Sequence, residues 1–158
     1  MSNLLTKSFD DLNFRPQEHN RGSVQLTIPK IDSHGRRLYY GIETTEEWLM
    51  EYAKADFRKR GHAPDRVYSD FMFLCESLRL LQWHSGMHTV SGKTVFRHGV
   101  PIPPLHVQTQ LLPKSRVVIV AIYSSGSKWF ANQPTRAQVD KLQRIMGGQE
   151  AKWWVSDM

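Results

Sequence analysis

The sequence predicts an α+β domain: a mostly antiparallel sheet, three helices packed chiefly on one face, and a terminal β-α-β unit. Three observations predict this class. Short stretches of alternating apolar and polar residues occur in neighbouring pairs, which is typical of β-hairpins. Three longer stretches carry apolar residues at helical spacing, and two of them begin at capping-box sequences. A continuous apolar run, VVIVAIY at 117–123, indicates a central strand covered on both faces.

The first predicted hairpin follows a polar N-terminal segment. Residues 1–23 are polar and mixed in charge, so we expect a poorly ordered arm there and a single domain over 24–158. Apolar residues alternate with polar ones in VQLTIPKID at 24–32 and again in RRLYYGIE at 36–43. The sequence SHG between them favours a turn, and the two stretches together predict a hairpin.

The first predicted helix begins at a capping box. The hydroxyl of Thr44 can accept a hydrogen bond from the backbone of Glu47, whose carboxylate can reach back. The helix is expected to end at Gly61, and the cations RKR at 58–60 suit its last turn. Its apolar stripe comprises Trp48, Leu49, Tyr52, Ala53 and Phe57.

The second predicted helix begins near Pro64 and ends at Gly86. Its apolar stripe comprises Val67, Phe71, Leu74, Cys75 and Leu78. The additional apolar residues Met72, Leu81 and Trp83 widen this stripe, so the helix is expected to be buried on two sides. Cys75 is accordingly expected to be a small core residue and not a reactive thiol.

The region after this helix predicts further strands. A second hairpin over 88–98 is expected to turn at Ser91-Gly92, and GVPIPP at 99–104 is an extended connector. Alternation in LHVQTQLL at 105–112 predicts a strand, which a turn at PKSR joins to the central strand 117–123.

The C-terminal region predicts a helix and a last strand, which complete the β-α-β unit. Thr135 and Gln138 form a second capping box, and Gly147 follows the helix that they begin. Val139, Leu142, Ile145 and Met146 make its apolar face. The sequence AKWWVS at 151–156 predicts the final strand.

Composition limits the class of protein. Apolar residues make up 40% and charged residues 23% of the chain, as in globular domains. No apolar run approaches the length of a membrane span, and MSNLLTKSFDDLNF lacks the apolar core of a secretory signal, so no membrane association is expected. The only cysteine, Cys75, cannot form an internal disulfide, which favours a reducing compartment, cytoplasmic or nuclear.

Positive charge is concentrated in one part of the sequence. The net charge is +6, and no Asp or Glu occurs in the 63 residues between Glu76 and Asp140. This stretch, 77–139, contains seven Lys and Arg residues, whereas the remainder carries 14 basic and 15 acidic residues. We therefore expect a basic face for nucleic acid or another polyanion.

Particular residues of this stretch are candidates for that contact. Backbone N–H groups of the Ser/Gly loop YSSGSKW at 123–129 could add to the binding of an anion. The predicted anion-binding residues are Lys93, Arg97, Lys114, Arg116, Ser125, Ser127 and Lys128. Trp129 and Trp154 are predicted to stack on bases, as aromatic residues do in single-strand binders.

An alternative hypothesis is a metal-independent enzyme. His84, His88 and His98 could act as general acid and base on a phosphate-bearing substrate, as in a ribonuclease-like reaction. A zinc site is disfavoured because Gly86 separates His84 from His88 and no HExxH sequence is present.

A third hypothesis, a domain that binds small molecules or other proteins, has no residue evidence for or against it. We expect no cofactor, since neither a Walker loop nor a GxGxxG sequence occurs. The sequence is also compatible with a homo-oligomer, and whether it catalyses a reaction is left open.

Overall fold

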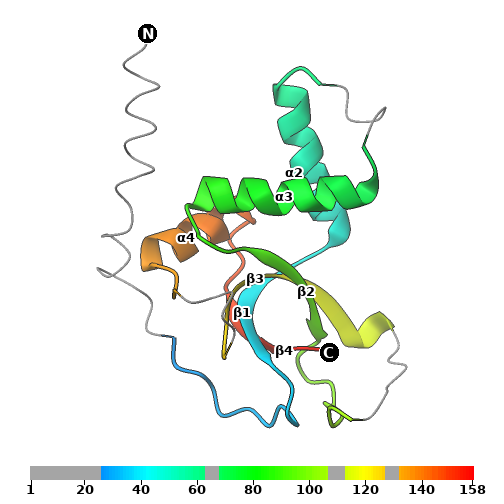
Figure 1. The fold of residues 1–158 in the computed structure, drawn as a ribbon, viewed down its shortest axis with the longest axis vertical. Coiled ribbons are helices and arrows are strands. Elements are labelled where there is room, and N and C mark those ends of the chain that lie inside the picture. Colours follow the sequence, from blue (N-terminus) through cyan, green and yellow to red (C-terminus); the bar gives the residue numbers. More distant parts are fainter. Residues whose placement is uncertain (1–25, 63–67, 107–112, 127–131) are drawn as a thin grey trace.

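A four-stranded antiparallel sheet forms the centre of the fold (Figure 1). The computed structural model describes residues 26–62, 68–106, 113–126 and 132–158. Within them the strands run in the order β2-β3-β1-β4. Their bounds are Leu38–Thr44 for β1, Ser91–Phe96 for β2, Arg116–Ser124 for β3 and Lys152–Val155 for β4. The run 117–123 is thus part of an interior strand, as predicted.

The sheet curves until its two edges meet. A bridge pairs Val95 of β2 with Ser156, just beyond β4, and the N–H of Asp157 donates to Thr94 O at 3.4 Å. The strands accordingly curve around a common centre in Figure 1. The side chains enclosed by this curvature are Tyr39, Val95, Val117, Ile119, Ala121 and Trp154, all buried.

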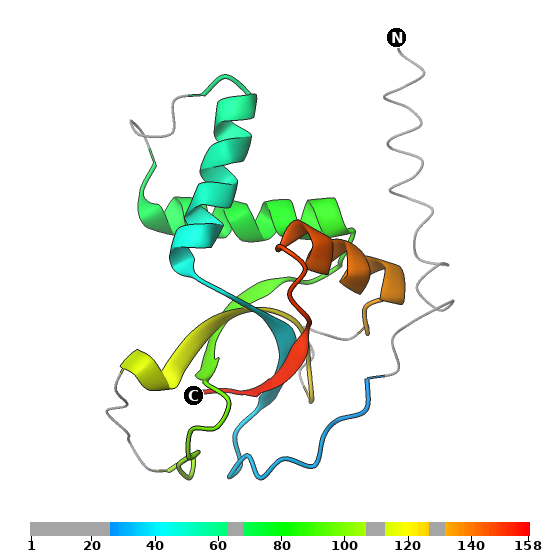
Figure 2. The same ribbon diagram turned by 180° about the vertical axis from the view of Figure 1, so that it is seen from behind.

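Three helices of the described residues cover the other face of the sheet, as Figures 1 and 2 show. They are α2 (Glu46–Lys59), α3 (Asp70–Ser85) and α4 (Arg136–Ile145). The main core lies between them and the sheet, and its members include Ile42, Val120, Ile122, Leu49, Leu81 and Leu142. The predicted α+β class, with helices on one face and a final β-α-β unit, is confirmed. None of these helices is long and apolar enough to cross a membrane.

A glycine allows β1 and β3 to approach closely. The pairing register of the two strands shifts between Tyr40 and Gly41, which is a β-bulge or irregularity. A Cβ atom at Gly41 would lie 2.3 Å from the carbonyl oxygen of Val120. Only glycine fits this position without moving the backbone.

Two of the three predicted helix starts are displaced. The second helix, α3, begins at Asp70 and not near Pro64, because Ser69 is its N-cap and accepts from Met72 N at 3.4 Å. The second capping box is present as predicted: Gln138 N–H donates to Thr135 Oγ1 and Thr135 N–H donates to Gln138 Oε1. The first helix is capped by Thr45 and not by Thr44, because the Thr45 hydroxyl accepts from Trp48 N at 3.1 Å. Gly86 ends α3 in the left-handed conformation, with φ 75°.

Both predicted hairpins are wrong. Residues 26–32 pair with none of the described strands and form no strand themselves. Ile28 in this stretch is 50% exposed, so the predicted apolar face is not buried. Ser91 and Gly92 form no turn, since both belong to β2 and pair with Ala121 and Val120 of β3. The predicted strand at 105–112 begins with a turn at 105–106, and its remainder, like the arm 1–23, lies outside the described residues.

The predicted buried face of α3 is only partly right. Leu81 is buried, and Leu74 and Leu78 pack against the main core, as predicted. Phe73, Ser77 and Leu80 are buried as well, whereas Phe71 is 73% exposed. Cys75, Met72 and Trp83 are exposed as well. Almost the whole circumference of the helix is apolar, so helical spacing alone fits either face. Contact with α2, α4 and the sheet decides which face is buried.

Candidate functional site

Three predicted cations meet where β2 ends and β3 begins. Phe96 of β2 pairs with Arg116 of β3, which places Arg97 just past this pair. The N–H of Arg97 donates to Ser115 O at 2.8 Å, and its Nε donates to Lys114 O at 3.0 Å. We call Arg97, Lys114 and Arg116 the basic edge. The turn Pro113–Ser115 that carries Lys114 lies well below α2 and α3 in Figures 1 and 2.

One carboxylate lies next to the basic edge. Arg116 Nη1 is 3.3 Å from Asp157 Oδ2, and the Asp157 side chain is only 8% exposed. Within the described ranges neither Arg97 nor Lys114 forms an ion pair, and both are exposed. The solvent-facing charge of the basic edge is therefore positive.

Arg36 fixes the backbone around the basic edge, a role that the sequence did not indicate. Its guanidinium donates to Pro103 O at 2.9 Å, to Asp157 O at 2.8 Å and to Pro104 O at 3.3 Å. It also lies over the ring of Phe96, 5.1 Å from the centroid, and Arg36 is 6% exposed. Arg36 thus joins the proline-rich connector, the C-terminus and the end of β2. No sequence pattern distinguishes it from the exposed arginines.

Two of the other predicted anion-binding residues, Lys93 and Ser125, do not join this cluster. Lys93 lies half-buried on β2, with its Nζ 5.5 Å from the centroid of the Tyr39 ring. Ser125 follows the opposite end of β3 from Arg116, and its N–H donates to Leu38 O at 3.3 Å. Ser127, Lys128 and Trp129 lie outside the described residues.

The structure contradicts a stacking role for Trp154. Trp154 is 4% exposed, and its indole N–H donates to Gly41 O at 3.1 Å. The imidazole of His98 covers the ring, with centroids 4.0 Å apart and planes 15° apart. Since β4 directs Trp154 into the enclosed interior, its neighbour Trp153 is the partly exposed indole of the pair.

The histidines of the alternative hypothesis contact different elements. Nδ1 of His84 shares a hydrogen bond of 2.5 Å with the hydroxyl of Tyr52 on α2. His98 Nε2 donates to Trp153 O at 2.9 Å, beside β4. His88 is exposed after α3, where its carbonyl accepts from Gln82 Nε2 at 2.7 Å. No group of three His, Cys, Asp or Glu side chains that could hold a metal occurs in the described part of the chain.

The tyrosine beside His84 keeps its proton at neutral pH. Burial is the larger cause that raises the pKa of Tyr52, and the carboxylate of Asp56 raises it further. Trp48 stacks on the ring of Tyr52, with centroids 5.2 Å apart. The Tyr52–His84 hydrogen bond therefore links α2 to α3 through a phenol that keeps its proton.

Comparison of the chain with protein-family models, curated proteins and solved structures found no match in any of the three.

Proposed function

We propose that this protein binds a polyanion at the basic edge, and that single-stranded nucleic acid is the ligand class to test first. The approach of Arg97, just after β2, to Lys114 and Arg116, at the start of β3, carries this proposal. Among the described residues one carboxylate pairs with these cations: the largely buried side chain of Asp157, which takes up part of the charge of Arg116. Two exposed cations are left for phosphate groups.

The backbone under these cations is already fixed. Arg97 is tied to Ser115 and Lys114 by two hydrogen bonds, and Arg36 holds the adjoining connector through Pro103 and Pro104. A site that is ordered before binding loses less conformational entropy when the ligand arrives. The affinity would come mainly from released counterions and should therefore depend strongly on salt.

An intracellular location, cytoplasmic or nuclear, belongs to the same proposal. Its support is the single cysteine: Cys75 is a free thiol on the exposed face of α3. Thiols persist in reducing compartments, where nucleic acids are also found.

The test is fluorescence anisotropy with a short labelled single-stranded RNA at several salt concentrations. The double variant Arg97→Ala/Lys114→Ala should lower the affinity by about tenfold and reduce the log–log salt slope by about 1.4, the value for two lost phosphate contacts. The matched control is Lys141→Ala/Arg144→Ala, which removes two exposed cations from α4.

Two results would refute the proposal. Binding that does not change with salt would exclude an electrostatic site, and an equal loss in both double variants would show that only net charge matters. A denaturing gel should show intact RNA after incubation. Cleavage that depends on His84 or His98 would favour the catalytic hypothesis instead.

A further inference from the structure

The outer face of α3 exposes large apolar side chains at both ends of the helix. Phe71 and Met72 in its first turn are 73% and 49% exposed, and Trp83 in its last turn is 59% exposed. Large apolar side chains that gather on the surface of a globular domain are typical of a contact surface. Within the described residues, no other element of the domain buries them.

Four side chains that reach the surface of α3 form one line along the helix. They are separated by four, three and four positions, a spacing that returns to the same side of an α-helix. We call them the α3 stripe: Met72, Glu76, Arg79 and Trp83. The stripe is about 16 Å long, is apolar at both ends and carries one negative and one positive side chain in the middle.

The two charged side chains of the stripe are paired within the chain. Glu76 accepts from Arg79 Nε at 2.9 Å and from Arg79 Nη2 at 2.6 Å, and Arg60 Nη2 lies 3.6 Å from the same carboxylate. Among the described residues Nη1 of Arg79 has no hydrogen-bond partner, and 57% of the Arg79 side chain is exposed. Arg79 can therefore donate a further hydrogen bond to a carboxylate outside its own chain.

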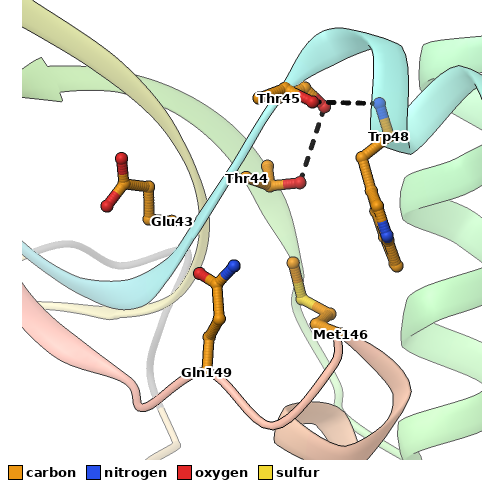
Figure 3. Close-up of a pocket in the computed structure, with 6 residues that line it drawn as sticks. All are labelled: Glu43, Thr44, Thr45, Trp48, Met146 and Gln149. Carbon is orange, nitrogen blue, oxygen red and sulfur yellow. Dashed lines mark hydrogen bonds between the residues drawn. The ribbon is translucent and has the colours of Figure 1, made fainter.

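The stripe is held in place from behind. On the buried face of α3, the ring of Phe73 packs on Phe57 of α2, with centroids 5.6 Å apart. The start of α2 is fixed in turn, because Thr45 Oγ1 accepts from Trp48 N, as the dashed line between them in Figure 3 shows. A surface that is ordered before association loses less conformational entropy when it is covered.

We propose that α3 pairs in antiparallel orientation with α3 of a second copy of this chain, about a two-fold axis between Glu76 and Arg79. Each Arg79 then lies opposite the partner's Glu76, and each Met72 lies opposite the partner's Trp83. An interface with two-fold symmetry has to be self-complementary, and the α3 stripe meets this condition in both charge and apolar contact. A parallel pairing would bring like charges face to face, which is repulsive.

The occupant that the stripe fits is a second copy and not a nucleic acid. One glutamate and one arginine make the stripe neutral, so it gives no electrostatic attraction for phosphate groups. The chain as a whole carries a net charge of +6, but two copies that meet at a neutral stripe place no like charges in contact. The stripe shares no residue with the basic edge, so either proposal can fail without the other.

Sedimentation equilibrium of the full-length protein at concentrations up to about 1 mM tests this pairing. A reducing agent is present, so that a disulfide through the exposed Cys75 cannot link two chains. The wild type should form a weak dimer, because one helix from each chain makes most of the interface. Glu76→Arg and Arg79→Glu each place like charges opposite one another, so each should weaken self-association about tenfold or more.

A mixture of the two charge variants is the decisive sample. An equimolar mixture of Glu76→Arg and Arg79→Glu pairs a positive stripe with a negative one, so heterodimers should form within about threefold of the wild-type affinity. Arg144→Glu is the matched control: it changes the net charge as Arg79→Glu does, but on the exposed side of α4, and should leave the dimer unchanged.

Three outcomes would overturn the proposal: a wild type that stays monomeric at about 1 mM, charge variants that self-associate like the wild type, or a mixture no tighter than either variant alone. Trp83→Lys decides the question if the charge variants fail to fold. Trp83 is exposed, so its replacement leaves the core intact, and self-association should still weaken about tenfold. An unchanged dimer in Trp83→Lys would also refute the pairing.

Discussion

Replacement of Gly41 by alanine should strongly destabilise the fold, because Gly41 lies where two strands approach most closely. The new Cβ would lie 2.3 Å from Val120 O and 2.9 Å from Ala121 Cα, whereas ordinary contacts begin at 3.4 Å. The neighbouring atoms are backbone, so β1 and β3 would have to separate locally by about 1 Å. Overpacking costs about 1–3 kcal/mol, and a weakened ladder hydrogen bond adds about 1 kcal/mol.

The expected loss in the free energy of unfolding is therefore about 3 kcal/mol, measured by urea denaturation followed by circular dichroism. For a chain of this length it corresponds to a decrease in Tm of roughly 6 to 12 °C. The same displacement would disturb the bond from the Trp154 indole to Gly41 O, so near-ultraviolet circular dichroism should change as well.

The matched control is Gly92→Ala on β2 of the same sheet. A Cβ there would meet only Leu78 Cδ1, at 3.6 Å, which is an ordinary contact. Both substitutions restrict the unfolded chain equally, by about 0.4–1 kcal/mol, so their difference isolates the steric effect in the native state. If the two variants unfold within about 1 kcal/mol of each other, the close approach of β1 and β3 at Gly41 is refuted.

Three further predictions concern buried and paired side chains. Hydrogen bonds from Arg79 at 2.6 and 2.9 Å are the main cause that holds the pKa of Glu76 below its ordinary value. This pair therefore stabilises the fold above about pH 4.3. The free energies of unfolding of the wild type and Glu76→Gln, measured in urea, should differ at pH 7 by less than about 1 kcal/mol. The two values should converge as the pH is lowered. Tyr52→Phe should cost about 1 kcal/mol at pH 7 by removing the bond to His84, and it should also remove part of the loss of stability above about pH 10, because burial raises the pKa of Tyr52. Arg36→Met leaves three carbonyl oxygens without their donor and should lower the free energy of unfolding in urea by about 2–4 kcal/mol; a loss below about 0.5 kcal/mol would mean that water replaces these bonds.

The elements that could be predicted from the sequence are those with local causes. The capping box of Thr135 and Gln138 needs only four consecutive residues, and its geometry is the same wherever the helix packs. The run 117–123 is apolar at every position, so it had to occupy the interior of a sheet. Gly86 ends α3 because glycine adopts the left-handed conformation without steric cost.

The errors arose where a distant partner decides the structure. Ser91 and Gly92 favour a turn locally, but pairing with β3 over six residues places them in a strand. In α3 the apolar spacing fits both Phe71 and Phe73, and only packing against Phe57 of α2 selects Phe73, with ring centroids 5.6 Å apart. The cap at Thr45 instead of Thr44 follows from the length of β1, which extends through Thr44.

The candidate site shows that a stretch of sequence without acidic residues need not form a surface without acidic residues, because the fold can bring a carboxylate from elsewhere in the chain. An antiparallel sheet brings distant segments together and separates adjacent ones, so Arg116 pairs with Asp157, 41 residues away. Ser125, nine residues after Arg116, lies at the other end of β3, and His84 contacts α2 instead of the sheet. The charge pattern of 77–139 therefore predicted that cations would gather, but only the pairing of β2 with β3 determines which of them meet.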